Sequence, residues 1–216
     1  MQNTSAKTSL MSFVSIIIAT TIILLSLLPS KVTAADNPQV VLVTTHGEIQ
    51  IELLPKFSPR HVSNFLALID ENFYEGLVFH RVIPNFMIQA GGYTENLTYR
   101  PTNRSVANES FNGLKNRKYT VAMARLDHPD SGDTQFFINV GNNTHLDATP
   151  DGPGYTVFGR VVSGRDVIES IELVDTGISM GMVAVPETPI VTPCEILQLF
   201  PIIVFEFNMI PPKCPI

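Results

Sequence analysis

Two polar side chains, Arg81 and Gln89, stand inside otherwise apolar runs and are the first candidates for chemistry. Arg81 lies in the run Val78–Val82, and Gln89 lies in the run Phe86–Ala90. Arginine is rarely fully buried without a partner, and its guanidinium is a permanently charged hydrogen-bond donor. The residues alone leave two interpretations open: a structural arginine that pairs with a carboxylate at a strand end, or a donor directed at a substrate.

Other kinds of chemistry have little support in the sequence. The 5 histidines lack the spacing of zinc ligands, and the 2 cysteines cannot form a four-cysteine zinc site. No Walker A loop and no G-x-G-x-x-G motif occurs. The net charge of −6 argues against general binding of nucleic acid, which requires a basic surface. We therefore expect no metal, no cofactor and no nucleic-acid partner, and we interpret His80 as a structural histidine.

The first elements that would position these side chains are a hairpin and a helix. Apolar and polar residues alternate over residues 40–54 around His46-Gly47, which predicts a β-hairpin. Ser58-Pro59 is typical of a helix start, with an N-cap residue followed by proline. Apolar residues at helical spacing then predict a helix that ends near Glu71.

The remainder of the central region predicts short strands and a second helix. Apolar runs of about five residues between Leu77 and Phe158 are separated by Gly, Asn, Asp and Pro, as in an antiparallel barrel or sandwich. A second amphipathic helix is predicted to begin at Ser163-Gly-Arg-Asp. Residues 189–200 are expected to add a strand, in which Pro193 indicates an edge or a bulge.

The N-terminal segment predicts export. The apolar run Phe13–Leu28 lies between two lysines, in a stretch without acidic residues. Val32 and Ala34 are small residues at the −3 and −1 positions of a cleavage site, so residues 1–34 are predicted to be a secretory signal peptide cut after Ala34. The alternative is an uncleaved membrane anchor.

The C-terminal segment, residues 201–216, is an apolar tail interrupted by prolines and too short to span a bilayer. Cys194 and Cys214 could form a disulfide in an oxidising compartment, and the tail would then be tied to the domain. Two free thiols or an intermolecular bridge are the alternatives.

Two segments carry a specific pattern: Phe79–Gly92, with the sequence F-H-R-V-I-P-N-F-M-I-Q-A-G-G, and Thr134–Val140, with the sequence T-Q-F-F-I-N-V. They resemble the cyclophilin peptidyl-prolyl cis-trans isomerases, and the resemblance extends from about Val40 to about Phe200. The exported, periplasmic bacterial branch of the family is the most similar, on the segments Ala122–Arg125, Ile138–Val140 and Gly154–Gly159.

The resemblance implies a mainly β domain over residues 35–200: a closed eight-stranded antiparallel barrel capped by two α-helices, with the substrate groove outside. By position, Arg81 and Gln89 match catalytic residues, and Gln135 matches a groove residue that bonds the substrate backbone or the arginine. Ala124 and Arg125 match the stretch that pairs with an extended peptide. The apolar walls of the proline pocket match Phe86, Met87, Phe137 and Leu146.

Two expected substrate-binding positions depart from the family pattern. His145 stands where the family often has tryptophan, whose indole contacts cyclosporin, so cyclosporin binding is expected to be weak. Tyr155 stands where the family often has histidine, and its ring is expected to form a wall of the proline pocket.

The resemblance implies an isomerase for X–Pro bonds that assists the folding of exported proteins in the bacterial periplasm. Its partners would be proline-containing unfolded or extended polypeptides. Rotation about an amide bond costs about 18–20 kcal/mol, and a donor that binds only the twisted nitrogen would lower that barrier without a cofactor. The alternatives are a non-catalytic peptide-binding or chaperone module on the same barrel, and an interaction protein anchored at a membrane through residues 13–28 and the tail.

Overall fold

The computed structural model describes residues 37–192 and the backbone of residues 196–199. The predicted signal peptide, both cysteines and the tail 201–216 lie outside these residues. The elements are β1 (Gln39–Thr44), β2 (Gly47–Leu53), α2 (Pro59–Asp70), β3 (Arg81–Ile83), β4 (Met87–Ala90), β5 (Thr120–Met123), η1 (Pro129–Ser131), β6 (Phe136–Asn139), η2 (Thr144–Leu146), β7 (Val157–Ser163), α3 (Arg165–Glu172), β8 (Thr176–Ser179), β9 (Met182–Pro186) and β10 (Ile196–Leu199).

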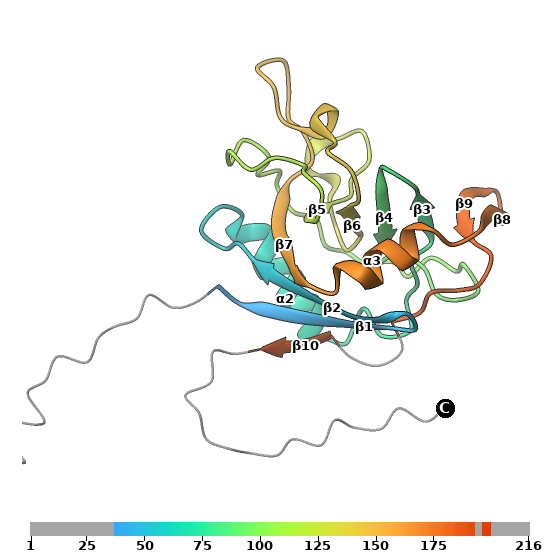
Figure 1. The fold of residues 1–216 in the computed structure, drawn as a ribbon. Coiled ribbons are helices and arrows are strands. Elements are labelled where there is room, and N and C mark those ends of the chain that lie inside the picture. Colours follow the sequence, from blue (N-terminus) through green and yellow to red (C-terminus); the bar gives the residue numbers. More distant parts are fainter. Residues whose placement is uncertain (1–36, 193–195, 200–216) are drawn as a thin grey trace, which may run out of the picture. The chain divides into compact units, whose positions relative to one another are not determined.

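The main sheet is antiparallel, with the strand order β10-β1-β2-β7-β5-β6-β4-β3. It curls like half of a barrel, and the helices α2 and α3 pack on it (Figure 1). A mainly β fold with two α-helices is thus confirmed. The prediction of a closed eight-stranded barrel is wrong, because β3 and β10 are the two edges and no ladder joins them among the described residues.

The sheet does not close through β3 and β10. The chain before β3 pairs only briefly, over residues 76–79, with residues 190–192, which lead toward β10. Val78 forms a single bridge with Val191, and the amide of Phe79 donates to the carbonyl of Ile190 at 3.0 Å. β3 itself has only 3 residues, all of them paired with β4. The sheet therefore stays open at this edge.

A second sheet, formed by β8 and β9, was not predicted from the sequence. This hairpin turns at Met180-Gly181, where both residues have positive φ, and β9 contacts β3. The first hairpin, in contrast, is confirmed: β1 and β2 pair from Gln39–Glu52 to Thr44–Gly47.

Helix α2 begins at Pro59, as predicted, and buries an apolar face that includes Val62, Phe65 and Leu68. The prediction that Ser58 supplies the cap is wrong in one respect: its side chain makes no capping hydrogen bond. The hydroxyl instead donates to the carbonyl of Val157 on β7, at 2.6 Å. No helix among residues 37–192 is long and apolar enough to cross a membrane.

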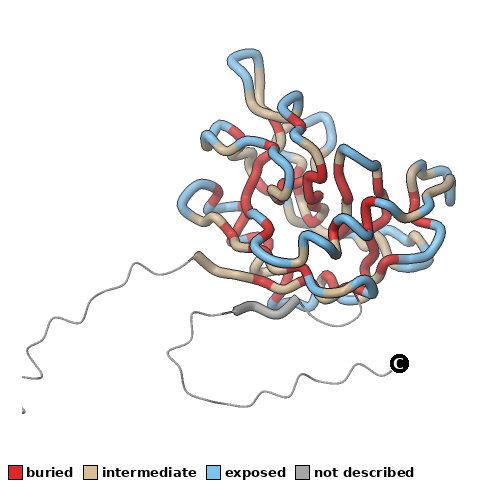
Figure 2. The backbone as a smooth tube through the Cα atoms, in the orientation of Figure 1, coloured by how far each residue is buried: buried red, intermediate tan, exposed pale blue. Residues whose placement is uncertain are grey.

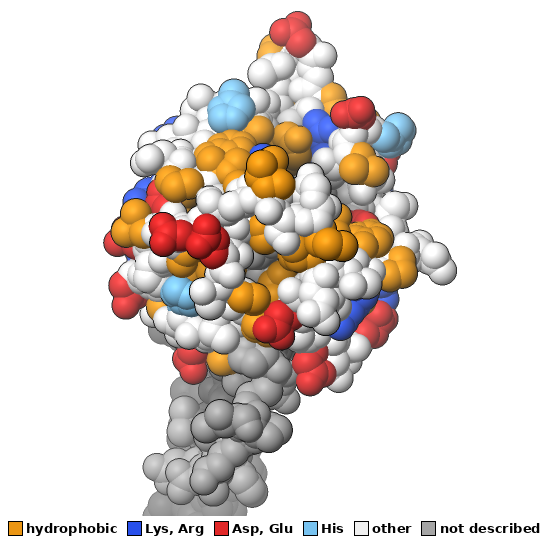
Figure 3. Space-filling model, turned by 90° about the vertical axis from the view of Figure 1, so that its right-hand side faces the viewer, with side chains coloured by type: hydrophobic (Ala, Val, Ile, Leu, Met, Phe, Trp, Pro, Cys, Tyr) orange, Lys and Arg blue, Asp and Glu red, His pale blue; other side chains and the backbone are white. Residues whose placement is uncertain are grey.

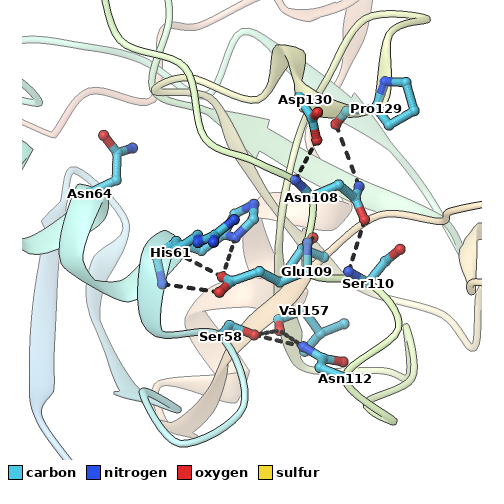
Figure 4. A network of polar contacts seen from close by, with 12 residues as sticks. Ser58, His61, Asn64, Asn108, Glu109, Ser110, Asn112, Pro129, Asp130 and Val157 are labelled. Atoms are coloured by element: carbon cyan, nitrogen blue, oxygen red, sulfur yellow. Dashed lines mark hydrogen bonds and ion pairs between the residues drawn. The ribbon is translucent and has the colours of Figure 1, made fainter.

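The free amides at the start of α2 are bound by a carboxylate from a distant loop (Figure 4). Glu109 accepts hydrogen bonds from the amides of Arg60 (3.2 Å) and His61 (3.1 Å), and its Oε2 lies 2.7 Å from Nδ1 of His61. A carboxylate at a helix N-terminus satisfies unpaired N–H groups and interacts favourably with the helix dipole. Glu109 thus joins the long loop between β4 and β5 to α2.

Buried residues concentrate in the strands and helices, and exposed residues in the loops (Figure 2). The buried hydrophobic side chains form two separate clusters. The larger lies between the sheet and the helices, where the ring of Phe65 packs on those of Tyr74, Phe136 and Phe158. The predicted second helix is confirmed as α3, which buries Ile168 and Ile171. The smaller cluster belongs to the candidate active site.

Candidate active site

The strand register brings the two polar side chains singled out in the sequence next to each other. Arg81 on β3 is directly opposite Gln89 on β4, and Gln89 is opposite Phe137 on β6. Side chains directly opposite in an antiparallel pair lie on the same face with Cβ atoms about 4.5–5.5 Å apart. Three neighbouring strands therefore present a cation, an amide and an aromatic ring on one surface.

A chain of hydrogen bonds holds these polar groups in place. Nη1 of Arg81 donates to the side-chain oxygen of Gln89 at 3.4 Å, and Nε2 of Gln89 donates to the side-chain oxygen of Gln135 at 3.0 Å. Arg81 forms no ion pair with a carboxylate of the described residues. The structural interpretation of Arg81, as the partner of a carboxylate, therefore has no support in this part of the chain.

Nine of the eleven predicted site residues line a single pocket of about 340 Å³. The two that do not line it are Gln135, which contacts it through Gln89, and His145. Arg81 and Gln89 contribute the polar part of the lining, together with Arg125. The remaining members are apolar or aromatic: Phe86, Met87, Ala124, Phe137, Leu146 and Tyr155.

The smaller hydrophobic cluster lies at the base of this pocket. Met87 and Phe137 are 2% and 4% exposed, and they pack with the buried Ala122 and Val157. The pocket base is therefore fixed by the packing of β4, β5, β6 and β7. Such a surface excludes water and suits a small apolar ring.

The side chain of Arg125 packs against the loop that carries Tyr155, and the expected pairing of its backbone with an extended peptide stays a prediction. Its guanidinium donates to the carbonyls of Gly154 and Pro153, at 3.3 and 3.2 Å, and lies 4.6 Å from the centroid of the Tyr155 ring. The Tyr155 ring also meets Phe137 edge-on, at 5.7 Å. Arg125 therefore orients Tyr155 as a wall of the pocket.

His145 lies at the outer rim. It is exposed, and its ring stacks on Phe86 with the centroids 5.6 Å apart. The preceding loop is held by Asn143, whose side chain donates to the carbonyl of Phe86 at 2.7 Å. His145 thus supports a wall residue and does not form part of the pocket surface.

His80, next to Arg81, is buried beneath the site with its ring 4.6 Å from that of Tyr93. The pKa of His80 is lowered to about 4, mainly by burial and in part by the nearby Arg81, while hydrogen bonding to Val78 and Gln135 acts in the opposite direction. His80 is consequently neutral near pH 7. Its Nδ1 has no hydrogen-bond partner among the described residues.

A second hollow of about 380 Å³ adjoins the pocket and shares Gln89, Ala124 and Arg125 with it. Its far side is formed by Tyr93 and Tyr99, residues that the sequence analysis did not select. Tyr93 follows the Gly91-Gly92 pair directly, but nothing in its spacing distinguishes it from a core aromatic residue.

The arrangement can bind an apolar ring beside a fixed cationic donor. Neither the pocket nor any other described part of the chain has a cluster of three His, Cys, Asp or Glu side chains arranged to hold a metal ion. The chemistry that this geometry supports is stabilisation of a lone pair or partial negative charge next to a bound ring.

Comparison with known proteins identifies the family and the fold. The family model described as "Cyclophilin type peptidyl-prolyl cis-trans isomerase/CLD" matches residues 40–195. The chain belongs to this family and is a peptidyl-prolyl cis-trans isomerase.

Several bacterial relatives share most of the domain. "Peptidyl-prolyl cis-trans isomerase cyp18" of Streptomyces antibioticus is 48% identical over 155 residues, which cover 70% of this chain and 93% of that protein. A peptidyl-prolyl cis-trans isomerase of Acinetobacter baylyi is 44% identical, over 73% of this chain and 84% of the relative. The match to an exported branch of the family stays a prediction.

Among solved structures, a cyclophilin-type isomerase of Cryptosporidium parvum has the same fold. It superposes with a TM-score of 0.61 at 23% identity, over 74% of this chain and 96% of that chain. A second crystal structure of that protein was determined in the presence of the dipeptide Ala-Pro. These matches support the family-based fold prediction, apart from the closure of the barrel.

Proposed function

We propose that this isomerase accelerates X–Pro isomerisation in extended polypeptides during the folding of exported proteins. The observation that carries the proposal is the position of Arg81 at the edge of the apolar pocket, opposite Gln89 and free of a carboxylate partner among the described residues. The proline ring would enter the pocket, and Arg81 would face the prolyl nitrogen.

The chemistry follows from the electronic structure of the amide. In the planar ground state the nitrogen lone pair is delocalised, and the barrier to rotation is about 18–20 kcal/mol. In the twisted transition state the lone pair is localised on nitrogen, which becomes a hydrogen-bond acceptor. A donor fixed at that position binds the transition state better than the ground state, which is the requirement for catalysis.

The pocket has two further roles in this proposal. Met87 and Phe137 would hold the ring while the preceding carbonyl turns, because their packing leaves them little freedom. An apolar surrounding would also favour the twisted amide, which has less charge separation than the planar form. Lowering the barrier by about 5.5 kcal/mol corresponds to roughly four decades in rate.

Gln89 is proposed as a positioning residue. Its side-chain oxygen restrains the guanidinium of Arg81, and its own amide is restrained by Gln135. We expect these two hydrogen bonds to limit the orientations that the Arg81 guanidinium can adopt.

The activity is tested by exchange NMR or a protease-coupled assay on short X–Pro peptides. Export is tested separately, by mass spectrometry of the protein recovered from the producing cells. A mature chain that begins at Ala35 supports export with cleavage. A chain that retains residues 1–34 and remains inside the cell contradicts the exported role and leaves the isomerase activity unaffected.

A further inference from the structure

A third hollow, which we call the hairpin pocket, lies between the β8–β9 hairpin and the chain segments around Val78 and Leu97. It has a volume of about 380 Å³. Its apolar lining comes from Val78, Phe79, Leu97, Ile178, Val185 and Pro186. None of these residues lines the candidate active site. The size falls within the range of small-ligand pockets, about 300–1,000 Å³.

The charged groups of the hairpin pocket all have the same sign. Glu95 and Glu187 line it, both are exposed, and no Lys or Arg of the described residues contributes to the lining. The whole chain is also acidic, with a net charge of −6. An apolar hollow with an acidic rim is complementary to an apolar side chain next to a basic one.

Three large apolar side chains of the β8–β9 hairpin are exposed to solvent. Ile178, Met180 and Val183 are 78%, 80% and 58% exposed. The side of the molecule that carries the hairpin shows hydrophobic side chains gathered near its middle, with acidic and some basic side chains around them (Figure 3). Contiguous exposed apolar surface rimmed by polar groups is typical of an interaction site.

The hairpin pocket is also close in the chain to the candidate active site. Val78 and Phe79 directly precede the β3 strand that carries Arg81, and β9 contacts β3. A polypeptide held in the hairpin pocket would therefore remain beside the proline pocket. When one site holds a polypeptide, the effective concentration of its other segments at a neighbouring site rises.

We propose that the hairpin pocket is a second binding site for unfolded polypeptide, selective for an apolar side chain next to Lys or Arg. The inference rests on the proposed isomerase function, since it assigns the occupant to the same extended substrates. It would retain a client near Arg81 and raise the isomerisation rate of long chains more than that of short peptides.

Gly177 offers a way to block this site without disturbing the backbone. It lines the hairpin pocket at ordinary negative φ, and a Cβ at this position would contact only the Glu187 carboxylate, at 3.7 Å. Gly177→Leu should therefore place a side chain in the pocket. Gly152→Leu is the matched control, because a Cβ there meets nothing within 4 Å and Gly152 lies in a different loop.

The test uses the full-length chain and a fluorescent peptide without proline, Lys-Leu-Lys-Leu-Lys, with Glu-Leu-Glu-Leu-Glu as the opposite-charge probe. We expect the basic probe to bind in fluorescence anisotropy and Gly177→Leu to weaken it at least about tenfold. Gly152→Leu should retain binding. The double variant Glu95→Gln/Glu187→Gln, which alters only exposed groups, should weaken binding about threefold, as expected for exposed charges.

Two rate measurements separate this proposal from the isomerase function itself. Gly177→Leu should leave isomerisation of an X–Pro tetrapeptide unchanged and slow the catalysed refolding of a proline-limited client several-fold. A wild-type chain that does not isomerise the tetrapeptide would refute the isomerase function, whether or not the fluorescent probe binds.

Three results would overturn the hairpin-pocket proposal. One is equal binding of both probes, and another is basic-probe binding that Gly177→Leu does not change. The third is tighter probe binding after removal of residues 201–216, because the occupant would then be the chain's own tail.

Discussion

The guanidinium of Arg81 lies 3.4 Å from the side-chain oxygen of Gln89, directly across the β3–β4 pair. A hydrogen bond of this length orients the cation without neutralising it. Because no carboxylate of the described residues pairs with Arg81, its remaining N–H groups are free to donate toward the pocket. This relationship accounts for a half-buried arginine that is held by an amide and has no carboxylate partner among the described residues.

Gln89→Leu is expected to reduce kcat/KM about tenfold, because Arg81 would lose its restraint while the cation itself remains. A protease-coupled assay on an Ala-Pro peptide measures the effect. Gln50→Leu is the matched control. Gln50 lies on β2, its side chain donates to Gln39, and β2 is far from the site in the sheet order. Equal activity in Gln89→Leu and wild type would refute the positioning role.

Phe137→Leu is expected to raise KM, because the base of the pocket would lose part of the ring surface that faces the proline. The substitution should also lower the free energy of unfolding by about 1–2 kcal/mol, since Phe137 is buried. Phe65→Leu, in the larger cluster, is the control with a similar stability cost and an unchanged KM. If both variants altered KM alike, Phe137 would have no specific role in binding.

Acidification is expected to destabilise the fold through His80. Its pKa is about 4 in the folded chain and about 6.5 when unfolded, so between these values the unfolded state binds more protons. The stability that His80 contributes is complete above pH 6.5, and about 3 kcal/mol of it is lost as the pH falls to 4. Urea unfolding at several pH values measures this loss.

His80→Gln should flatten that part of the pH profile, whereas the exposed His46→Gln should not. Burial also lowers the pKa of His61 despite the opposing effect of Glu109, so some pH dependence should remain in the His80 variant. An unchanged profile in His80→Gln would mean that His80 titrates normally in the folded protein.

Glu109→Gln is expected to cost about 1–3 kcal/mol, because the amide cannot accept from both backbone donors that the carboxylate oxygens now bind. Hydrogen exchange should increase at the amides of Arg60 and His61. Glu71→Gln breaks only an exposed ion pair with Arg104 and should cost under about 1 kcal/mol. Equal costs for the two variants would show that Glu109 does not cap α2.

The sequence predicted the elements and the pocket well where a local pattern or a family motif determined them. The β1–β2 hairpin, both helices and nine pocket-lining residues are examples. The family motif predicted the pocket because the register that joins Arg81 to Gln89 and Phe137 lies within two ungapped segments.

Features that depend on distant segments could not be predicted. The capping of α2 by Glu109 joins residues 48 apart in the chain, and no local pattern marks it. The β8–β9 hairpin leaves apolar side chains exposed, so it lacks the alternation that indicates a strand. Closure of the sheet depends on whether β3 and β10 pair, which the length of an apolar run does not reveal.

The most direct test of the central claim is the isomerisation rate of an Ala-Pro peptide with Arg81→Ala, measured by exchange NMR. Within the described part of the chain, the Arg81 side chain makes one long hydrogen bond, so the circular dichroism spectrum and unfolding midpoint should stay close to those of wild type. The rate should fall at least about a hundredfold, and Arg81→Lys should recover only part of it, because lysine lacks the planar fork of donors. Arg160→Ala, at an exposed ion pair with Glu52, should keep full activity. Exchange near the wild-type rate in a folded Arg81→Ala protein would contradict the account.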